Sequence, residues 1–418
     1  MKRIIAILLA VCLVSAMLAA CGNKIDNGNN PGVNTGDQQN NIPGDQGNAS
    51  GAVYDTDFVY DNGLEYIWER LDDKMKTNVA EMMNAIKSVS PICNLTYGVP
   101  VDEANDFLTF ISNMCIDYTY LGTRFTFRDS DEDGVKETVY FTYNTDVISY
   151  EQDAWDITDQ LNAKLDEIIA SIPSGITEWE KVKYLHDYLV FSTTYSEDAK
   201  IPFTAYGALI ENKATCQGYA DAMHLLLHRA GFETVFVIGH GDSMNLTHKW
   251  NYVKLSDGQW YILDPTWADP ARQTDPQYIN YDYFLISDEY LLMDHHEKFD
   301  SPYYEVPVAT SMEQSYHHVM GYECSSYEEA YACAEKQVRE CVAEGRRYVY
   351  LRFTDMETFT EARQKLSLIE YGAELQYILK DVKADTGANI KAGSWQTYPK
   401  EGEISPLTII ITLKYEDD

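Results

Sequence analysis

The sequence has few cysteines, few basic residues and no apolar run long enough for a comfortable membrane span. Its eight cysteines are spread over 418 residues, which excludes the dense disulfide framework of small secreted domains. Only 32 Lys and Arg residues stand against 66 Asp and Glu residues, giving a formal net charge of −34. Because nucleic acids and anionic lipid surfaces attract basic proteins, we expect no nucleic-acid partner. The length and the 45% hydrophobic content allow two or three domains with full cores.

The first 20 residues have the features of a secretory signal peptide. A basic start, MKR, precedes the apolar run 4–18, which is shorter than the roughly 20 residues of a spanning helix. The stretch LAAC at 18–21 resembles the lipobox of bacterial lipoproteins. That resemblance implies cleavage before Cys21 and lipid modification of Cys21. We therefore expect a lipid-anchored protein on the extracellular face of a bacterial cell membrane, with an ordinary secretory signal as the alternative.

Composition divides the remaining chain into four segments. Residues 21–52 are rich in Asn, Gly, Asp and Gln and predict a flexible tether. Residues 53–160 predict an N-terminal α+β accessory domain, with helical spacing over 64–89 and two alternating strands within 123–144. Residues 161–300 mix helices and strands. Residues 301–418 predict a C-terminal α+β module, and the whole chain is assigned to the α+β class.

The polar turn between the two strands imitates a calcium-binding loop. Asp129, Asp131, Asp133 and Gly134 match the start of an EF-hand loop, but the twelfth position is Tyr140, where a bidentate Glu is required. We therefore favour a plain hairpin turn and expect no metal and no cofactor.

Cys216 stands at the predicted start of an apolar helix. Thr215 is a candidate N-cap and Gly231 a candidate stop. The helix dipole and the unpaired N–H groups at such a position favour a thiolate. Gly218 leaves the first turn uncrowded, so that a substrate backbone could approach. Because inert buried cysteines are the commoner case, a catalytic interpretation still requires a base.

Four histidines are poor candidates for that base. His224 and His228 lie on the same predicted helix, about 12 and 18 Å along its axis from Cys216, whereas proton transfer needs about 3 Å. Their i, i+4 spacing imitates a zinc site but lacks the accompanying Glu. The side chains of the adjacent His295 and His296 are expected to diverge.

The segment 247–267 offers a better candidate. It predicts a hairpin around Ser256, Asp257 and Gly258 with a three-residue loop. This register places Asp264 opposite Trp250, so that His248, two residues along, points to the same face. Asp264 could then orient the imidazole while His248 faces the thiol. A two-residue loop would put the two side chains on opposite faces.

Residues 178–300 resemble the transglutaminase-like superfamily. The motifs C-x-G-Y-A, H-x-W-N-x-V and W-Y-x-x-D-P-T-W occur in that order. The resemblance implies a papain-like core, with the cysteine-bearing helix packed on an antiparallel sheet. It further implies Cys216 as the nucleophile, His248 as the base and Asp264 as the group that orients it. Asn251 and Tyr219 belong to the motifs and are interpreted as structural supports.

Other site residues are weaker candidates. By analogy with the family, Tyr195 is a candidate donor to the oxyanion, beside the backbone N–H of Cys216. Gln217 follows the nucleophile and lines either the surface or the cleft. Trp250 and Trp267 are candidate walls of a substrate groove, although packing of the hairpin is the favoured alternative.

Several reactions share this thioacyl chemistry. We expect hydrolysis of a peptide or amide bond in a protein or peptide substrate, as in a cysteine peptidase or amidase. Cross-linking of glutamine to lysine, as in a protein-glutamine gamma-glutamyltransferase, is the first alternative. A catalytically silent surface binding or scaffold module is the second, and the presence of all three triad residues weighs against it.

Overall fold

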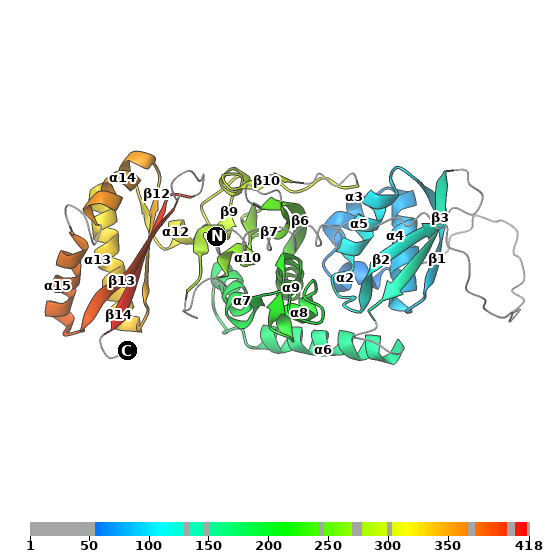
Figure 1. Cartoon of the computed structure of the whole chain (residues 1–418), viewed down its shortest axis with the longest axis horizontal. Coiled ribbons are helices and arrows are strands. Elements are labelled where there is room, and N and C mark those ends of the chain that lie inside the picture. The colour runs from blue at the N-terminus through cyan, green and yellow to red at the C-terminus, as the bar shows by residue number, and fades with distance from the viewer. Residues whose placement is uncertain are drawn as a thin grey trace, which may run out of the picture. The chain divides into compact units, whose positions relative to one another are not determined.

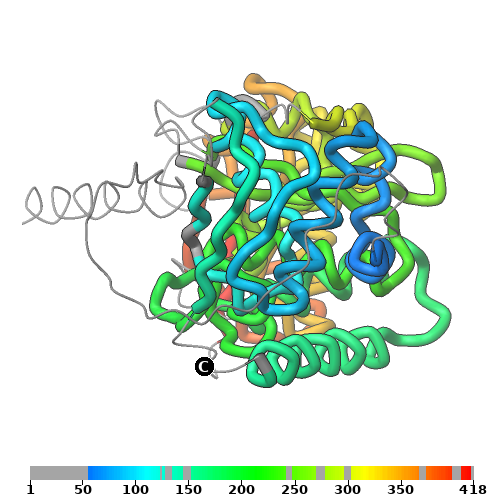
Figure 2. The backbone as a smooth tube through the Cα atoms, turned by 90° about the vertical axis from the view of Figure 1, so that its right-hand side faces the viewer, coloured from blue at the N-terminus to red at the C-terminus, as the bar shows by residue number. Residues whose placement is uncertain are grey.

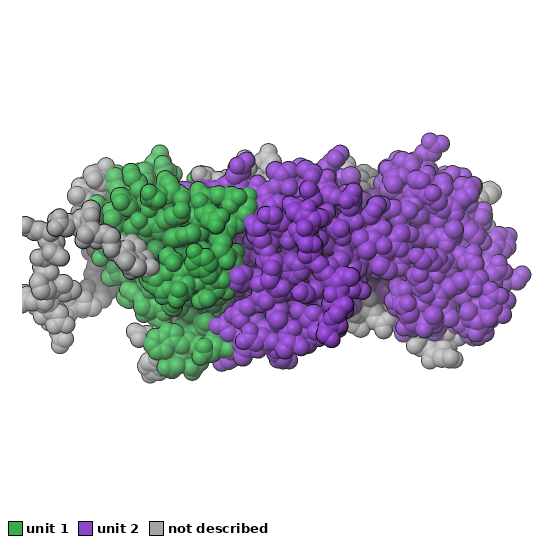
Figure 3. Space-filling view, turned by 180° about the vertical axis from the view of Figure 1, so that it is seen from behind, with its two compact units in different colours: residues 1–159 green, residues 160–418 purple. Residues whose placement is uncertain are grey.

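The computed structural model describes residues 55–128, 134–144, 151–241, 246–269, 278–298, 303–366, 373–398 and 406–415. The chain forms two compact units, residues 1–159 and 160–418 (Figure 3). Within the described ranges, no helix is long and apolar enough to span a membrane. The predicted α+β class is confirmed, because helices accompany sheets that are antiparallel in most of their pairings. The predicted signal peptide, the tether and Cys21 lie outside the described residues.

Unit 1 combines helices with a three-stranded antiparallel sheet, whose strands lie side by side in Figure 2 in the order β1-β3-β2. Its elements are α2 (Asp57–Asp61), α3 (Glu65–Arg70), α4 (Asp73–Lys87), β1 (Ile92–Pro100), α5 (Ala104–Met114), β2 (Leu121–Arg128) and β3 (Val135–Tyr143). The predicted helical stretch 64–89 is divided between α3 and α4, because Asp72 caps α4 by accepting a hydrogen bond from the Met75 N–H.

The predicted hairpin within 123–144 is confirmed by the antiparallel pairing of β2 and β3, with Phe125 opposite Phe141. Residues 129–133 of its turn, which carry the three aspartates of the calcium-like pattern, lie outside the described residues. The strand β1 was missed in the sequence, where it shows no clear alternation. Its burial does alternate at the start, where it pairs with β3.

Unit 2 contains a five-stranded antiparallel sheet in the order β10-β6-β7-β8-β9. The long helix α6 (Glu151–Ala170; Figure 1) belongs to unit 2 from Gln160 onward. The strands are β6 (Glu233–Gly241), β7 (Leu246–Lys254), β8 (Trp260–Leu263), β9 (Phe284–Ile286) and β10 (His295–Lys298). The other elements are α7 (Glu178–Ser192), β4 (Thr194–Tyr195), α8 (Ala205–Leu209), β5 (Lys213–Ala214), α9 (Cys216–Arg229), α10 (Pro265–Ala268), η1 (Tyr281–Tyr283) and α11 (Asp288–Leu291). Helix α9 packs on β6 and β7, so that its N-terminus is held against this sheet.

The last part of unit 2 contains a four-stranded sheet in the order β11-β12-β14-β13. Its elements are α12 (Tyr316–Val319), β11 (Glu323–Cys324), α13 (Tyr327–Glu344), β12 (Tyr348–Phe353), α14 (Met356–Lys365), α15 (Leu375–Thr386), β13 (Ile390–Tyr398) and β14 (Thr408–Tyr415). The sequence pattern of this part also predicts a helix over 326–345 and strands within 346–353 and 407–417, and α13, β12 and β14 confirm these elements. Residues 356–385 have a helical pattern in the sequence and form two helices, α14 and α15. The strand β13 was not predicted from the sequence. Whether this part is a separate domain from residue 301 stays a prediction.

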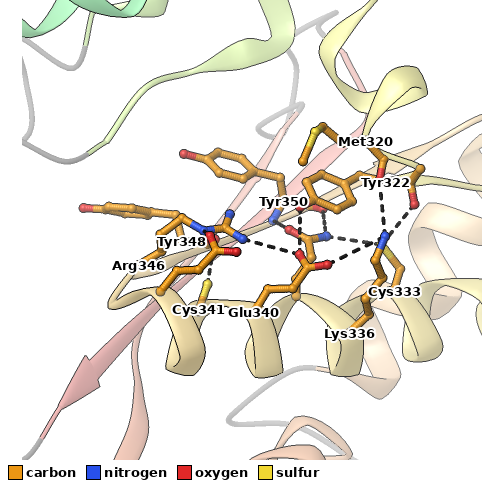
Figure 4. Close-up of polar contacts among 12 residues, drawn as sticks. Met320, Tyr322, Cys333, Lys336, Glu340, Cys341, Arg346, Tyr348 and Tyr350 are labelled. Atoms are coloured by element: carbon orange, nitrogen blue, oxygen red, sulfur yellow. Dashed lines mark hydrogen bonds and ion pairs between the residues drawn. The ribbon is translucent and has the colours of Figure 1, made fainter. Parts of the chain in front are cut away.

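Polar contacts join the helices and strands of this part. Glu340 on α13 accepts hydrogen bonds from the Tyr322 hydroxyl, at 3.1 Å, and from Arg346, at 3.4 Å (Figure 4). The Tyr350 hydroxyl donates to the carbonyl of Ile279 at 2.8 Å, and Arg352 pairs with Asp282 at 3.1 Å. Asp282 is adjacent to Tyr283, whose carbonyl accepts a hydrogen bond from the Asp264 N–H at 3.1 Å, so these contacts reach the neighbourhood of Asp264.

Candidate active site

Cys216 is the first residue of α9, which runs from Cys216 to Arg229 with Thr215 at the N-cap position. The predicted start is therefore confirmed, and Gly231, with a φ of +91°, follows the C-cap as predicted. The Thr215 side chain makes no capping hydrogen bond and donates instead to the carbonyl of Pro202 at 3.3 Å. The Thr215 side chain therefore does not cap the N–H groups of the first turn. These groups lie at the end of the helix where the dipole favours negative charge. The cysteine itself is partly exposed.

The reason for Gly218 differs from the prediction. A Cβ atom at this position would lie 2.7 Å from the carbonyl oxygen of Pro202 and 2.8 Å from that of Thr204. The space beside the first turn is therefore filled by the protein's own backbone and is not open to a substrate. Glycine is required because residues 202–204 pack directly against α9.

The hairpin of β7 and β8 has the predicted register. Asn251 pairs with Leu263 and Lys254 with Trp260, so that Asp264, one residue further, lies opposite Trp250. The loop has three residues and ends at Gly258, whose φ is +80°. The strand alternation thus brings His248 and Asp264 to the same face, as predicted.

Asp264 is completely buried and accepts four hydrogen bonds. Its Oδ2 atom accepts from His248 Nε2 at 2.6 Å and from His295 Nε2 at 3.0 Å. Its Oδ1 atom accepts from the backbone N–H groups of Thr266 and Trp267 at 3.0 and 3.1 Å, because Asp264 is the N-cap of α10. A carboxylate with this many donors stays ionised despite its burial. Burial raises the pKa of Asp264, but the charges and hydrogen bonds of the two histidines outweigh it and hold the pKa well below its usual range.

His248 is poised as a cation between Asp264 and Cys216. Burial by itself lowers the pKa of His248, but the negative charge of Asp264 and its hydrogen bond raise the pKa to about 10, with a further contribution from the Cys216 sulfur. Because Nε2 is bound to Asp264, Nδ1 is the nitrogen left for the thiol. The Cys216 Sγ atom lies 4.0 Å from the carbonyl oxygen of Thr247, the residue before His248. Thiol, imidazole and carboxylate therefore converge although they are far apart in sequence.

His295 is the site residue that the sequence did not reveal. The sequence excluded it as a base, yet its Nε2 atom bonds to Asp264 and its Nδ1 atom bonds to Asp294 Oδ1 at 2.8 Å. It reaches Asp264 because β10 pairs with β6, with His295 opposite Gly241. An Asp–His dipeptide after the last core strand is too common a signal to identify such a residue.

Two buried polar contacts dock α9 on β7 beside the site. Lys249 pairs with Asp221, and both are buried. The Asn251 side chain donates to the carbonyl of Ala220 at 2.9 Å, in keeping with the predicted supporting role of Asn251. Together they fix the cysteine-bearing helix relative to the histidine-bearing strand.

Three of the weaker candidates remain at the rim of the site. Tyr195 is 42% exposed, and β4 pairs with β5 so that Tyr195 lies opposite Ala214, two residues before Cys216. Its N–H donates to Asp269 at 3.1 Å. Gln217 is partly exposed and donates a hydrogen bond to Asp221. Trp267 is half-buried, with its ring 4.1 Å from that of His295.

Trp250 does not line a groove in this structure. It is 1% exposed, and its ring packs 5.9 Å from His248 and 5.6 Å from His295. The candidate role as a wall of the substrate groove is therefore wrong, and the alternative of packing within the hairpin is the one that burial supports. The physical reason is that the same strand face that carries His248 turns Trp250 into the core.

Three donors of the kind that bind metal ions lie close together here. Ligand atoms of His248, Asp264 and His295 fall within 4.8 Å of one another. Both histidines direct Nε2 at the same carboxylate oxygen at hydrogen-bond distances, so we interpret the group as hydrogen-bonded. The two histidines of the zinc-like pair differ in burial. His224 is buried with its ring 5.7 Å from that of Phe236, whereas His228 is partly exposed. None of the six cysteines of the described residues forms a disulfide.

Residues 166–265 match the family model of the transglutaminase-like superfamily. The matched range contains Cys216, His248 and Asp264. This segment is a transglutaminase-like domain. Comparison with curated proteins gave no match.

Solved structures that are similar to part of this chain share little sequence with it. They include a TGase (16% identity, 37% of this chain and 47% of that chain, TM-score 0.25). A candidate cysteine protease from Cytophaga hutchinsonii is 14% identical over 33% of this chain and 53% of that chain, with a TM-score of 0.23. The periplasmic domain of TgpA from Pseudomonas aeruginosa is 15% identical over 35% and 66%, with a TM-score of 0.22. The chain thus spans 47% to 66% of these solved chains.

Proposed function

We propose that the transglutaminase-like domain is a thiol acyl-transfer enzyme that hydrolyses peptide or amide bonds at the bacterial cell surface. One observation carries this proposal. The imidazole of His248 is bonded through Nε2 to the buried Asp264 and interacts with the sulfur of Cys216, which begins a helix. A binding or scaffold module has no need for this arrangement, whereas a nucleophilic cysteine requires it.

Acylation follows from these groups. The His248 imidazolium stabilises a thiolate on Cys216, which attacks the carbonyl carbon of the scissile amide. The carbon–sulfur bond forms as the carbonyl oxygen takes up negative charge. His248 then gives its Nδ1 proton to the leaving nitrogen, the carbon–nitrogen bond breaks, and a thioester remains on Cys216. Throughout, Asp264 holds the ring and its charge, as the third member of such triads does.

Hydrolysis completes the cycle. The neutral His248 accepts a proton from water, and the resulting oxygen nucleophile attacks the thioester. The carbon–sulfur bond breaks, a carboxylic acid is released, and the thiolate–imidazolium pair returns. An amine in place of water would give a transglutaminase product by the same steps, so the acceptor that reaches the partly exposed Cys216 decides the outcome.

We assign the support of the oxyanion to two groups. The backbone N–H of Cys216 lies in the uncapped first turn of α9, where amide donors favour negative charge. The second candidate is Tyr195, which the pairing of β4 with β5 holds opposite Ala214, two residues before the cysteine. We assign it the supporting role that the family resemblance implies.

The location is part of the proposal. The stretch 18–21 resembles a lipobox, so a lipid on Cys21 would hold the protein at the outer face of the cell membrane. Its substrate is then a protein or peptide at the cell surface. The net charge of −34 agrees with the absence of a nucleic-acid partner from this proposal.

The test is amide-substrate profiling with the Cys216→Ala protein as blank. A library of peptides is incubated with and without a labelled primary amine. Cys115→Ala serves as the matched control because Cys115 is another partly exposed cysteine that forms no disulfide. We expect cleavage that Cys216→Ala abolishes and Cys115→Ala retains. Amine incorporation without cleavage would identify cross-linking instead. If neither arm gives a product, and Cys216 and Cys115 are alkylated at equal rates, the proposed enzyme is rejected in favour of a catalytically silent surface binding module.

A further inference from the structure

The carboxylate of Asp264 is bonded to two imidazoles, whereas a cysteine–histidine–aspartate triad uses one. His248 and His295 both bond to the same oxygen, Oδ2, at 2.6 and 3.0 Å. The opposite oxygen is occupied by the backbone of α10. The orientation of this carboxylate is therefore set from three sides, and the side opposite the backbone is divided between two imidazoles.

His295 is itself held by a second carboxylate. Its Nδ1 atom faces Asp294 Oδ1 at 2.8 Å, and Asp294 Oδ2 accepts from the Tyr283 hydroxyl at 2.6 Å. Because an ionised carboxylate only accepts hydrogen bonds, both ring nitrogens of His295 must donate, and the ring must carry a positive charge. Burial lowers the pKa of His295, but its hydrogen bonds to Asp264 and Asp294 outweigh burial and the repulsion of His248 and raise the pKa.

The surroundings of the His295 ring leave it little freedom. The ring is 1% exposed and lies 4.1 Å from the Trp267 ring and 5.6 Å from the Trp250 ring, centroid to centroid. Among the described residues, the titratable groups around it are Asp264, Asp294, His248 and Tyr283. Such a ring is too enclosed to meet a substrate, so any role in the reaction must act through Asp264.

We propose that His295 is a positioning residue, which holds the Asp264 carboxylate so that its shared oxygen stays on the catalytic imidazole of His248. This inference rests on the proposed thiol acyl-transfer function and deepens it. A line of hydrogen bonds then runs from His248 through Asp264 and His295 to Asp294, and Cys216 interacts with the His248 end of it. A rival explanation is that His295 only fills space in the aromatic cluster.

The first experiment examines the native protein. Selective ¹⁵N-histidine labelling and NMR at pH 7 report the protons on each ring, and His295→Gln assigns the signals by their loss. We expect His295 to carry protons on both nitrogens. A neutral ring with one N–H would overturn the proposal, since it could not donate to both carboxylates.

The second experiment separates hydrogen bonding from packing by two substitutions. His295→Phe keeps an aromatic ring but no donor, whereas His295→Gln keeps one donor but no ring. The rate of Cys216 alkylation by iodoacetamide at pH 7 is measured by mass spectrometry of the Cys216 peptide. We expect a loss of about tenfold for the phenylalanine variant, because a buried acceptor loses its partner, and a smaller loss for the glutamine variant. A native rate in the phenylalanine variant, or an equal loss in both, would overturn the proposal.

A matched control is available in the same unit. His186 is also fully buried, and its Nδ1 atom also bonds to the adjacent aspartate, Asp187, at 3.1 Å. His186→Gln should leave Cys216 alkylation at the native rate. If it reduces the rate as much as His295→Gln does, the effect is a general loss of stability and the positioning role fails.

Failure of this inference can be told apart from failure of the proposed function. Alkylation and the NMR signals need no substrate, so they test His295 even when no amide is cleaved. Native protein that cleaves peptides while His295→Phe labels at the native rate rejects only the positioning role. If the native protein neither cleaves peptides nor transfers the acyl group to an amine, but His295 is doubly protonated, only the proposed enzymatic function is rejected.

Discussion

Substitution of Asp264 by Asn is the sharpest test of the site. The amide keeps nearly the shape of the carboxylate and retains an acceptor for the N-terminus of α10. It replaces the charged oxygen that faces both histidines with either an uncharged oxygen or an NH₂ group. If the NH₂ group faces His248, the ring must present a lone pair on Nε2. The proton then sits on Nδ1, so His248 cannot accept a proton from Cys216.

The magnitude follows from the His248 imidazole. Its pKa is raised from 6.5 to about 10, which corresponds to roughly 5 kcal/mol of interaction with its surroundings. At pH 7.5 the native ring is therefore about 99% imidazolium or more. Without the carboxylate, burial remains and lowers the pKa, so at most about a tenth of the rings are charged at that pH. The thiolate–imidazolium pair should fall by about tenfold or more.

The assay is the rate of iodoacetamide labelling at Cys216, resolved by mass spectrometry and followed from pH 5 to 9.5. We expect the native protein to label on a plateau through neutral pH and Asp264→Asn to label at least about tenfold more slowly at pH 7.5. Asp187→Asn is the control, since Asp187 is another largely buried aspartate bonded to a histidine. An unchanged profile in Asp264→Asn would refute the coupling of the three groups.

Three further predictions concern the scaffold. Lys249→Met should destabilise unit 2 by about 3–5 kcal/mol, because it leaves Asp221 buried without its cation. Burial already raises the pKa of Asp221 to about 6, so the loss in melting temperature should grow between pH 5 and pH 8 as the carboxyl ionises; a deficit independent of pH would contradict this. Gly218→Ala should destabilise by about 1–3 kcal/mol, since backbone oxygens lie 2.7 and 2.8 Å from the new Cβ; an unchanged melting curve would show that this contact is not tight. Arg352→Met should lower the free energy of unfolding by about 3–5 kcal/mol, because it leaves Asp282 buried without its guanidinium partner. Cleavage of the variant at the native rate in limited proteolysis would contradict this.

Much of the local structure was readable from the sequence. The start of α9 at Cys216 was predicted correctly, although the Thr215 side chain does not cap the helix, and its end follows from Gly231. The three-residue loop at 256–258 fixed the register of β7 and β8, and the register placed His248 and Asp264 on one face. These features depend on residues close in sequence, since capping, turn conformation and strand alternation are local properties.

Other features were misread because they also depend on neighbours. The stretches 64–89 and 356–385 each show a continuous helical pattern of apolar residues in the sequence, but each forms two helices. The strands β1 and β13 lack a clear alternation, and pairing with β3 and β14 holds them in the sheets. Tertiary hydrogen bonds here override weak local preference.

By itself, the sequence pointed to Cys216, His248 and Asp264 as the candidate triad, to the elements that carry them and to the face that His248 and Asp264 share. Only the tertiary structure decided that β10 lies beside β6, which brings His295 to Asp264. It also decided that backbone carbonyls fill the space beside Gly218 and that the core buries Trp250. The reason is the range of the interactions, because strand order and burial arise from contacts between segments far apart in the chain, to which no local pattern of residues corresponds.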